Sequence, residues 1–394
     1  MNFIIFILLV FILAYVVGYL FNKIGLPKLL GYLSVGIVIG NFFNYDYLIS
    51  DDIIRFITSF ALSIILLKAG LGLEKMVMKK IGIKVLILGA VPNIIEALIL
   101  TIISFYLLHF GIYEALMFGF IISAVSPAVV IPSMTKLMDD GYDKEITTLN
   151  LGAIMIGDVI SLTMFSVFLA LYLGDGNPTL LLLMAPVNVI LGGIVGGVLG
   201  WVLGKLLRHS TNIKLQILQF LIVVAVALVL KEYGHYLFII EMIAVISLGF
   251  MINDTNKAVG TYLKKHVNNL WLFTQVFLFF IIGFLTDLDL IGEYLVIGVG
   301  ILSLGLLGRT AGIYIALHKT DYTYNQKHFS SLSNLPKATV QAALGVIPLS
   351  YGVTNGDIIL SLSALAIIIT APLGLLLIEV FSVKLLTREP LKVN

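Results

Sequence analysis

Six ionisable side chains lie inside long apolar runs of this 394-residue sequence, and they are the first candidates for chemistry. They are Lys68, Glu96, Asp158, Glu241, Arg309 and Lys337. If the apolar runs cross a membrane, each charge near the bilayer centre costs about 2.5–3.5 kcal/mol on insertion scales. Charges at that depth therefore mark functional sites by default.

Asp158 is the most isolated of these charges. It stands in the segment LGAIMIGDVISL, about 12 residues into its apolar run, and a helix rising 1.5 Å per residue would carry it about 18 Å deep. No neighbouring side chain of that helix can neutralise it. A carboxylate satisfied by hydroxyls or by a lysine of another helix is the structural alternative. The depth and isolation favour an ion- or proton-binding site.

Glu96, in VPNIIEALIL, and Arg309, in LLGRTAGIYIAL, carry opposite charges at similar depth. They would neutralise each other if their helices touch, so we expect a buried salt bridge with a structural role. Lys68 stands near the end of its apolar run, where its long side chain can extend to the interface. Glu241 is a weaker candidate that would line an aqueous funnel.

Two apolar runs are interrupted by proline near their middle. Pro127 lies in ISAVSPAVVIPSM and Pro336 lies in LSNLPKATVQAALG. Proline removes a backbone donor and frees a carbonyl, and interrupted helices in corresponding positions of two halves point to a transporter's binding site. Two ordinary proline kinks are the alternative. Lys337 follows Pro336, so its ammonium could neutralise the C-terminal end of a half-helix or stand in for a cation.

The composition decides the class of protein that carries these residues. Hydrophobic residues make up 60% of the chain, charged residues 12%, and the mean hydropathy is +1.09. Soluble proteins have about 25% charged residues, so this is a polytopic membrane protein. A net charge of +2 gives no reason to expect nucleic-acid binding. Without cysteine, HExxH or a second deep aspartate, neither an enzyme nor a cofactor is expected.

The apolar runs predict about thirteen membrane-spanning helices, and a short piece at 254–266 is expected to lie at the interface. The predicted spans are 2–22, 27–44, 52–72, 82–108, 114–137, 146–173, 179–206, 213–230, 235–252, 268–286, 293–317, 328–351 and 357–384. The interrupted spans are the fifth of spans 1–6 and the fifth of spans 8–13. The spare seventh span gives the two halves opposite topology, which is an inverted repeat.

Lysine and arginine predict the orientation. Nineteen of the 24 basic residues fall on alternate connections, and only Arg55 and Lys231 fall on the others. Because cytoplasmic loops are enriched in basic residues, the N-terminus is expected outside and the C-terminus in the cytoplasm. We expect a prokaryotic inner (cell) membrane.

Four segments together resemble the monovalent cation/proton antiporter superfamily, and most closely its NHA-type Na⁺/H⁺ antiporters. They are LPKATVQAALG (335–345), LPKLLGYLSVGIVIGN (26–41), AVSPAVV (124–130) and the acidic segment around Asp158. The resemblance implies crossed broken helices, a dimerisation domain, a core ion-transport domain and a homodimer. Its domains would be 1–78 and 211–290 for dimerisation, 79–174 and 291–394 for the core, and 175–210 for the linker helix.

The resemblance also implies a role for each site residue. Asp158 would bind the transported Na⁺ and the proton alternately, beside an unwound stretch at Ser126 and Pro127. Arg309 and Glu96 would be the supporting ion pair, and Lys337 the lysine of the second broken helix. Relatives carry aspartate or asparagine immediately before the binding aspartate, whereas this sequence has Gly157. With one carboxylate fewer, we expect electroneutral one-for-one exchange.

The expected function is therefore exchange of Na⁺ or Li⁺ for H⁺ across the lipid bilayer by alternating access. Potassium/proton exchange on the same scaffold stays open, because nothing in the sequence fixes the ionic radius. A cation channel is an alternative of another class, but it needs a filter loop or pore-lining rings, and no such segment is found. A receptor or structural protein would leave the deep charges without a purpose.

Overall fold

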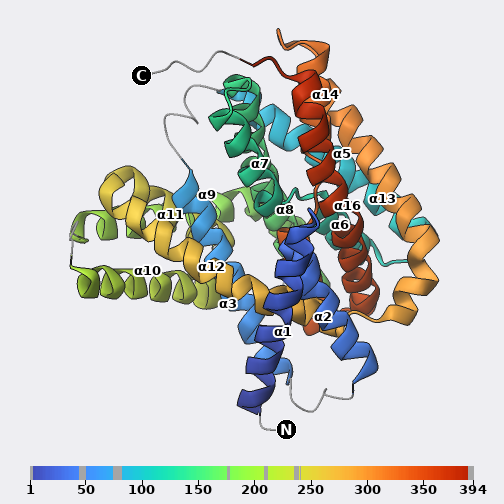
Figure 1. The fold of residues 1–394 in the computed structure, drawn as a ribbon, viewed down its shortest axis with the longest axis horizontal. Helices are drawn as coiled ribbons and strands as arrows, with labels where there is room; N and C mark the ends of the chain where they lie inside the picture. The colour runs from blue at the N-terminus through green and yellow to red at the C-terminus, as the bar shows by residue number, and fades with distance from the viewer. Residues whose placement is uncertain are drawn as a thin grey trace. The chain divides into compact units, whose positions relative to one another are not determined.

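The structure is a computed structural model that describes residues 3–43, 50–73, 82–174, 178–207, 212–234, 239 and 241–388. These residues are helical almost throughout (Figure 1), which confirms the all-α class. The predicted orientation rests partly on basic residues at 75–80, 208 and 392, which lie outside the described residues.

Every predicted span corresponds to one helix or to a pair of helices, with bounds that differ by a few residues in most cases. The helices are α1 (Phe3–Lys23), α2 (Lys28–Phe42), α3 (Asp51–Gly72), α5 (Ile83–Leu107), α6 (Ile112–Ser123), α7 (Pro127–Asp139), α8 (Lys144–Leu173), α9 (Pro178–Leu206), α10 (Ile213–Tyr233), α11 (Glu241–Thr255), α12 (Lys257–Leu285), α13 (Leu288–Ala316), α14 (Tyr324–Ser333), α15 (Thr339–Ser350) and α16 (Gly356–Leu385). Nine helices of the described chain are long and apolar enough to span a membrane by themselves. The total of thirteen spans stays a prediction.

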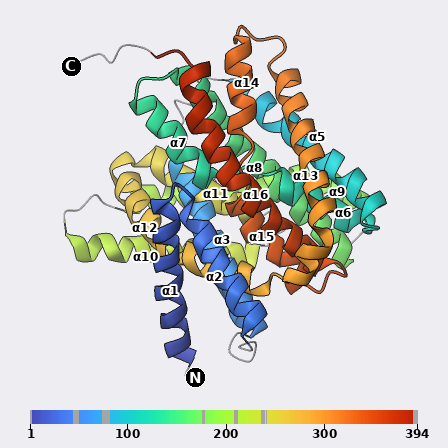
Figure 2. The ribbon, with the colours of Figure 1, turned by 45° about the vertical axis from the view of Figure 1, so that its right-hand side comes forward.

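The two spans that the sequence predicts to be interrupted, with Pro127 and Pro336, are broken. The fifth span is divided into α6 and α7, and Pro127 is the first residue of α7. Proline is favoured at that position because its missing N–H would have no helical partner. The twelfth span is divided into α14 and α15, and Pro336 lies in the non-helical stretch between them. Figure 2 shows α15 leading into α16 in the C-terminal part of the chain.

The expected separate interfacial piece at 254–266 is wrong. Residues 254–255 end α11, and α12 begins at Lys257 and continues unbroken to Leu285. The side chain of Asn256 accepts a hydrogen bond from the Val259 amide at 3.2 Å, which starts the new helix. No proline follows in 257–285. The polar first turns therefore continue directly into the apolar part of the same helix.

The chain divides into two compact units. The first contains residues 1–48, 81–172 and 279–394, and the second contains residues 49–80 and 173–278. All the broken helices belong to the first unit. The assignment of a dimerisation domain, a linker helix and a core domain stays a prediction.

Glycines bring α9 and α11 into close contact within the second unit. A Cβ atom at Gly196 would lie 2.0 Å from the Ala244 carbonyl oxygen, and one at Gly200 would lie 2.5 Å from that of Leu248. Small residues let membrane helices approach at backbone distance. Gly196 and Gly200 of α9 therefore serve helix packing.

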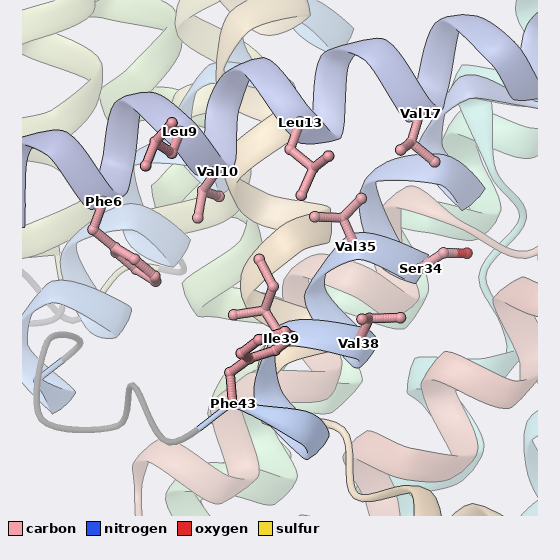
Figure 3. A pocket seen from close by; sticks show the side chains of 10 residues that line it. All are labelled: Phe6, Leu9, Val10, Leu13, Val17, Ser34, Val35, Val38, Ile39 and Phe43. Atoms are coloured by element: carbon pink, nitrogen blue, oxygen red, sulfur yellow. The ribbon is translucent and has the colours of Figure 1, made fainter. Parts of the chain in front are cut away.

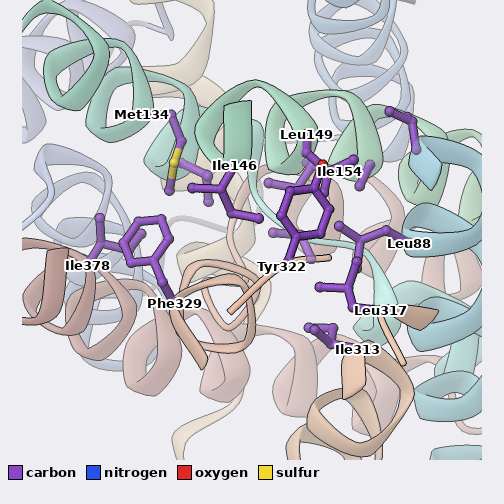
Figure 4. Close-up of a cluster of buried hydrophobic side chains, with 14 of the residues drawn as sticks. Leu88, Met134, Ile146, Leu149, Ile154, Ile313, Leu317, Tyr322, Phe329 and Ile378 are labelled. Atoms are coloured by element: carbon purple, nitrogen blue, oxygen red, sulfur yellow. The ribbon is translucent and has the colours of Figure 1, made fainter. Parts of the chain in front are cut away.

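A hydrophobic cluster in the first unit packs the broken helices against their neighbours (Figure 4). It joins α5, α7, α8, α13, α14 and α16. Its labelled members are Leu88, Met134, Ile146, Leu149, Ile154, Ile313, Leu317, Tyr322, Phe329 and Ile378. Because protein interiors are close-packed, this cluster fixes α7 and α14 relative to α8.

The segment after α16 is tied to the loop between α7 and α8. The Asp143 amide donates to the Thr387 carbonyl at 3.1 Å, and Tyr142 and Arg388 form an isolated antiparallel bridge. The Arg388 guanidinium donates to the Asp140 carbonyl at 3.0 Å and lies over the Tyr142 ring. We call these contacts the C-terminal clasp.

The close approach of α9 and α11 predicts opposite effects for two neighbouring glycines. Gly196→Ala should lower the free energy of unfolding by about 1–3 kcal/mol, the usual range for overpacking, because the new methyl group meets a backbone oxygen. Gly193→Ala is the matched control: its nearest foreign atom is 3.8 Å away, so alanine should be neutral or stabilise the helix by about 0.5–1 kcal/mol. Thermal melts in detergent compare the two, and equal melting temperatures would contradict the packing.

Candidate ion-binding site

Two helix breaks meet in the first unit and are hydrogen-bonded to each other. The Ser126 amide donates to the Pro336 carbonyl at 2.8 Å. The Ser126 hydroxyl lies 3.4 Å from the Thr339 hydroxyl and accepts from the Thr339 amide at the same distance. Ser126 is fully buried. Because backbone groups inside a membrane need protein partners, each break satisfies part of the other.

Gln341 of α15 caps the C-terminal end of α6. Its side-chain amide donates to the carbonyls of Ile121 at 2.9 Å and Ala124 at 2.8 Å. The last carbonyls of any helix lack helical partners, and α6 ends inside a buried region where Ser123 and Ala124 are fully covered. Gln341 therefore joins the second broken helix to the end of the first.

The Ser123 carbonyl, the last of α6, accepts hydrogen bonds from three other side chains. Arg309 of α13 donates to it through its guanidinium, Asn93 of α5 donates to it at 3.2 Å, and the Lys337 ammonium lies 3.4 Å away. Cations stabilise the negative C-terminal end of a helix. The expectation that Lys337 neutralises a half-helix end agrees with this geometry.

Glu96 is shared by two cations. Its carboxylate forms an ion pair with Arg309, as opposite charges at similar depth predict, and a second one with Lys337 at 2.9 Å. Glu96 and Lys337 are fully buried, and Arg309 is 3% exposed. The sequence does not predict the contact with Lys337, because that contact depends on how the two helix breaks cross.

Asp158 lies near Arg309 and Lys337, and one of its carboxylate oxygens has no hydrogen-bond partner among the described residues. The residue is 8% exposed, and its Oδ1 atom is buried without a hydrogen-bond partner among the described residues. The carboxylate faces the backbone amide of Val125, in the first break, and the charges of Arg309 and Lys337 act on it. A buried acceptor without a donor is costly, so this oxygen is suited to a proton or a cation.

Asp158 thus faces the first break at Val125, and Pro127 starts the half-helix that follows the break. The positive N-terminal end of α7 lies at Ser126 and Pro127, where a carboxylate is stabilised. The deep charges therefore separate into two groups. The cations lie at the C-terminal end of α6, and Asp158 lies beside the break that leads into α7.

Sequence reasoning missed the amide of Asn93 and the hydroxyls of Ser123 and Ser161. The three side chains form one buried cluster in which Asn93 donates to Ser161 at 3.0 Å, and the two hydroxyls are 3.1 Å apart. Asn93 precedes Glu96 by one helical turn, so it lies on the same face of α5. A polar residue one turn from a buried charge was the available signal.

Two of the six deep charges lie elsewhere, in the second unit. Glu241 forms an ion pair with Lys231 at 3.2 Å, and the Lys68 ammonium lies 5.9 Å from the centre of the Trp271 ring. Neither contributes to the cluster around Glu96.

An apolar pocket of about 530 Å³ lies between α1 and α2 (Figure 3). Its one polar side chain, Ser34, donates its hydroxyl to the Leu30 carbonyl at 2.7 Å. Among the described residues that line the pocket there is therefore no carboxylate to bind an ion.

The fold and the site together define a secondary transporter for ions: membrane-spanning helices, two of them broken, enclose a buried carboxylate at the point where the breaks meet. The family described as "Sodium/hydrogen exchanger, transmembrane" matches residues 7–382, so the chain belongs to the sodium/hydrogen exchanger family. This confirms the resemblance to monovalent cation/proton antiporters, and cation/proton antiport is the class of activity. Such a protein is a transporter rather than an enzyme.

Individual relatives agree with this assignment. The chain is 28% identical to sodium/hydrogen exchanger 9B1 of Homo sapiens over 386 residues, which are 94% of this chain and 75% of the human protein. It is 30% identical to sodium/hydrogen exchanger 9B1 of Mus musculus over 387 residues, 94% of this chain and 68% of the mouse protein. The fold matches the sodium proton antiporter MjNhaP1 of Methanocaldococcus jannaschii with a TM-score of 0.84 and 21% identity, covering 97% of this chain and 98% of that one.

The shared carboxylate predicts unequal losses of stability. Glu96→Gln should lower the free energy of unfolding by about 3–5 kcal/mol, because it leaves two buried cations without their counter-charge. Arg309→Met should lower it by about 1–3 kcal/mol, since Lys337 still neutralises Glu96 and the main loss is a buried hydrogen bond. Chemical denaturation in detergent measures both values. Equal losses would contradict a carboxylate shared by two cations.

Proposed function

We propose that the protein exchanges Na⁺ or Li⁺ for H⁺, one for one, by alternate binding of cation and proton at Asp158. The observation that carries the proposal is the buried Oδ1 atom, which has no hydrogen-bond partner among the described residues. An ionised carboxylate in that position needs a positive partner of its own. A transported cation and a proton are the two partners that an exchanger of this family would supply.

Competition for one carboxylate couples the two ions. A proton on Asp158 removes the negative charge that attracts the cation, and a bound cation disfavours protonation. The protein therefore carries one ion or the other across, never both. Further oxygen ligands for the cation are available from the Ser126 hydroxyl and from the backbone next to Pro127, since Ser126 adjoins the Val125 amide that faces Asp158.

The charge of the site supports electroneutral exchange. Arg309 and Lys337 are two positive groups, and Glu96 and ionised Asp158 are two negative groups. A proton or a sodium ion on Asp158 adds the same single charge. Lys337 is held by Glu96 at 2.9 Å, and in this proposal it stays protonated through the cycle, so that no second proton accompanies the exchange.

We further propose that the protein works by alternating access, as other transporters built on broken helices do. In this proposal the helices around Asp158, from α5 to α8 and from α13 to α16, form the moving core. The protein would act as a homodimer in the cell membrane, with its N-terminus outside and its C-terminus in the cytoplasm. Potassium remains the rival cation, because Asp158 by itself sets no ionic radius.

Asp158→Asn should abolish exchange while leaving a folded protein, because an amide of the same size neither binds a proton nor neutralises a cation. The assay is the decay of an imposed pH gradient in proteoliposomes when Na⁺, Li⁺ or K⁺ is added. The control is Asp289→Asn, an exposed carboxylate in the first turn of α13, which should exchange at the wild-type rate. Sodium-driven proton movement by Asp158→Asn would refute the proposal, and a response to K⁺ alone would change the cation.

One-for-one exchange predicts that the rate is insensitive to membrane potential. An imposed potential of either sign should leave the initial rate of Na⁺-driven proton movement unchanged, because no net charge crosses the bilayer. The measurement uses the same proteoliposomes with the potential clamped by an ionophore. A rate that changes with potential in proportion to one net charge would contradict one-for-one exchange.

A further inference from the structure

The side chain of Asn93 forms hydrogen bonds with two other helices beside the ion site, α6 and α8. It lies on α5, is 1% exposed, and its Nδ2 atom donates to three acceptors. They are the Ser123 carbonyl at 3.2 Å, the Gly157 carbonyl at 3.2 Å and the Ser161 hydroxyl at 3.0 Å. A side-chain amide has two N–H groups, so these acceptors share them.

The amide oxygen of Asn93 also has hydrogen-bond partners. The Asn93 Oδ1 atom lies 3.4 Å from the hydroxyls of Ser123 and Ser161, each of which can donate to it. A buried polar network with all its members paired is rigid and fixes one geometry. Through this network one side chain of α5 connects the end of α6 to the middle of α8.

Gly157 leaves the space that this amide fills. A Cβ atom at position 157 would lie 3.4 Å from Asn93 Nδ2 and 3.2 Å from the Gly89 carbonyl oxygen. A larger side chain at 157 would extend into the volume of the Asn93 amide. The glycine and the asparagine are therefore complementary, and the space holds one polar side chain rather than two.

We propose that Asn93 is a positioning residue of the ion site, which supplies from α5 the polar side chain that Gly157 does not supply from α8. Its amide holds the carbonyl of the peptide between Gly157 and Asp158, and the same amide holds the last carbonyl of α6. It thereby fixes Asp158 relative to the break at residues 124–126. The inference rests on the proposed function, because it concerns how tightly Asp158 binds its cation.

Loss of the amide should weaken cation binding more than it slows transport. Without Asn93 the Gly157 peptide is free to shift, and the cation loses a fixed carboxylate. In Asn93→Ala the KM for Na⁺ should rise about tenfold, which corresponds to about 1.4 kcal/mol. The maximal rate should stay within about twofold, since Asp158 remains present to carry either ion.

The decisive experiment transfers the amide from one helix to the other. The wild type, Asn93→Ala, Gly157→Asn and the double variant N93A/G157N are compared in proteoliposomes over a range of Na⁺ concentrations. Gly157→Asn alone should be the least stable, because it crowds the amide and the Gly89 carbonyl. The double variant returns one amide to the same space, and its KM should fall back to within about threefold of the wild type, because the two changes interact directly.

Two results would overturn the proposal. One is an unchanged KM for Na⁺ in Asn93→Ala, with only the amount of folded protein reduced, which would assign Asn93 to packing alone. The other is a double variant with a KM no better than that of Asn93→Ala. If Asn93→Ala does not fold, Asn93→Ser, which keeps a short donor, is compared with the wild type. A raised KM there supports the proposal and an unchanged one refutes it.

The controls separate this inference from the proposed function. Ser104→Ala removes a buried hydroxyl of α5 whose hydrogen bond within the described part of the chain goes to the Thr101 carbonyl of the same helix at 3.2 Å, and it should leave the KM unchanged. Wild-type protein and Asp158→Asn test antiport itself. Exchange by the wild type, its loss in Asp158→Asn and a wild-type KM in Asn93→Ala would retain the function and reject the role of Asn93.

Discussion

The end of α6 inside the protein is the constraint on which the site depends. A helix that stops at Ser123 leaves carbonyls without partners where no water can satisfy them. Their donors come from four places in the sequence: Asn93 on α5, Arg309 on α13, Lys337 in the second break and Gln341 on α15. Satisfying one helix end therefore brings together most of the groups that surround the ion site.

The same constraint explains why the deep charges differ in their freedom. Arg309 and Lys337 are each held by Glu96 and by the Ser123 carbonyl, so their charges are part of the framework. Asp158 faces the Val125 amide in the break that leads into α7. Among the described residues it has no ion-pair partner and its Oδ1 atom has no hydrogen-bond partner, which is why we propose it as the group that exchanges partners.

The sequence predicts the local features well and the assembled site only in part. Proline, apolar length and isolated charge identify both breaks, the ion pair of Glu96 with Arg309, and Asp158, because each follows from the chemistry of one segment. The second contact of Glu96, with Lys337, depends on how the two breaks cross, which no spacing encodes. Asn93 is an ordinary polar residue in a helix until α8 lies against it. The separate piece expected at 254–266 fails because local polarity does not end a helix.

The C-terminal clasp has a consequence for labelling this protein. Thr387 and Arg388 are fastened to the loop that joins α7 to α8, and α8 carries Asp158. A fluorophore or spin label attached at residue 387, which bonds to Asp143 through its backbone carbonyl, would therefore follow the half-helix and the carboxylate-bearing helix as one rigid group. Distances recorded from such a probe would describe the displacement of the ion site, rather than independent motion of the chain terminus.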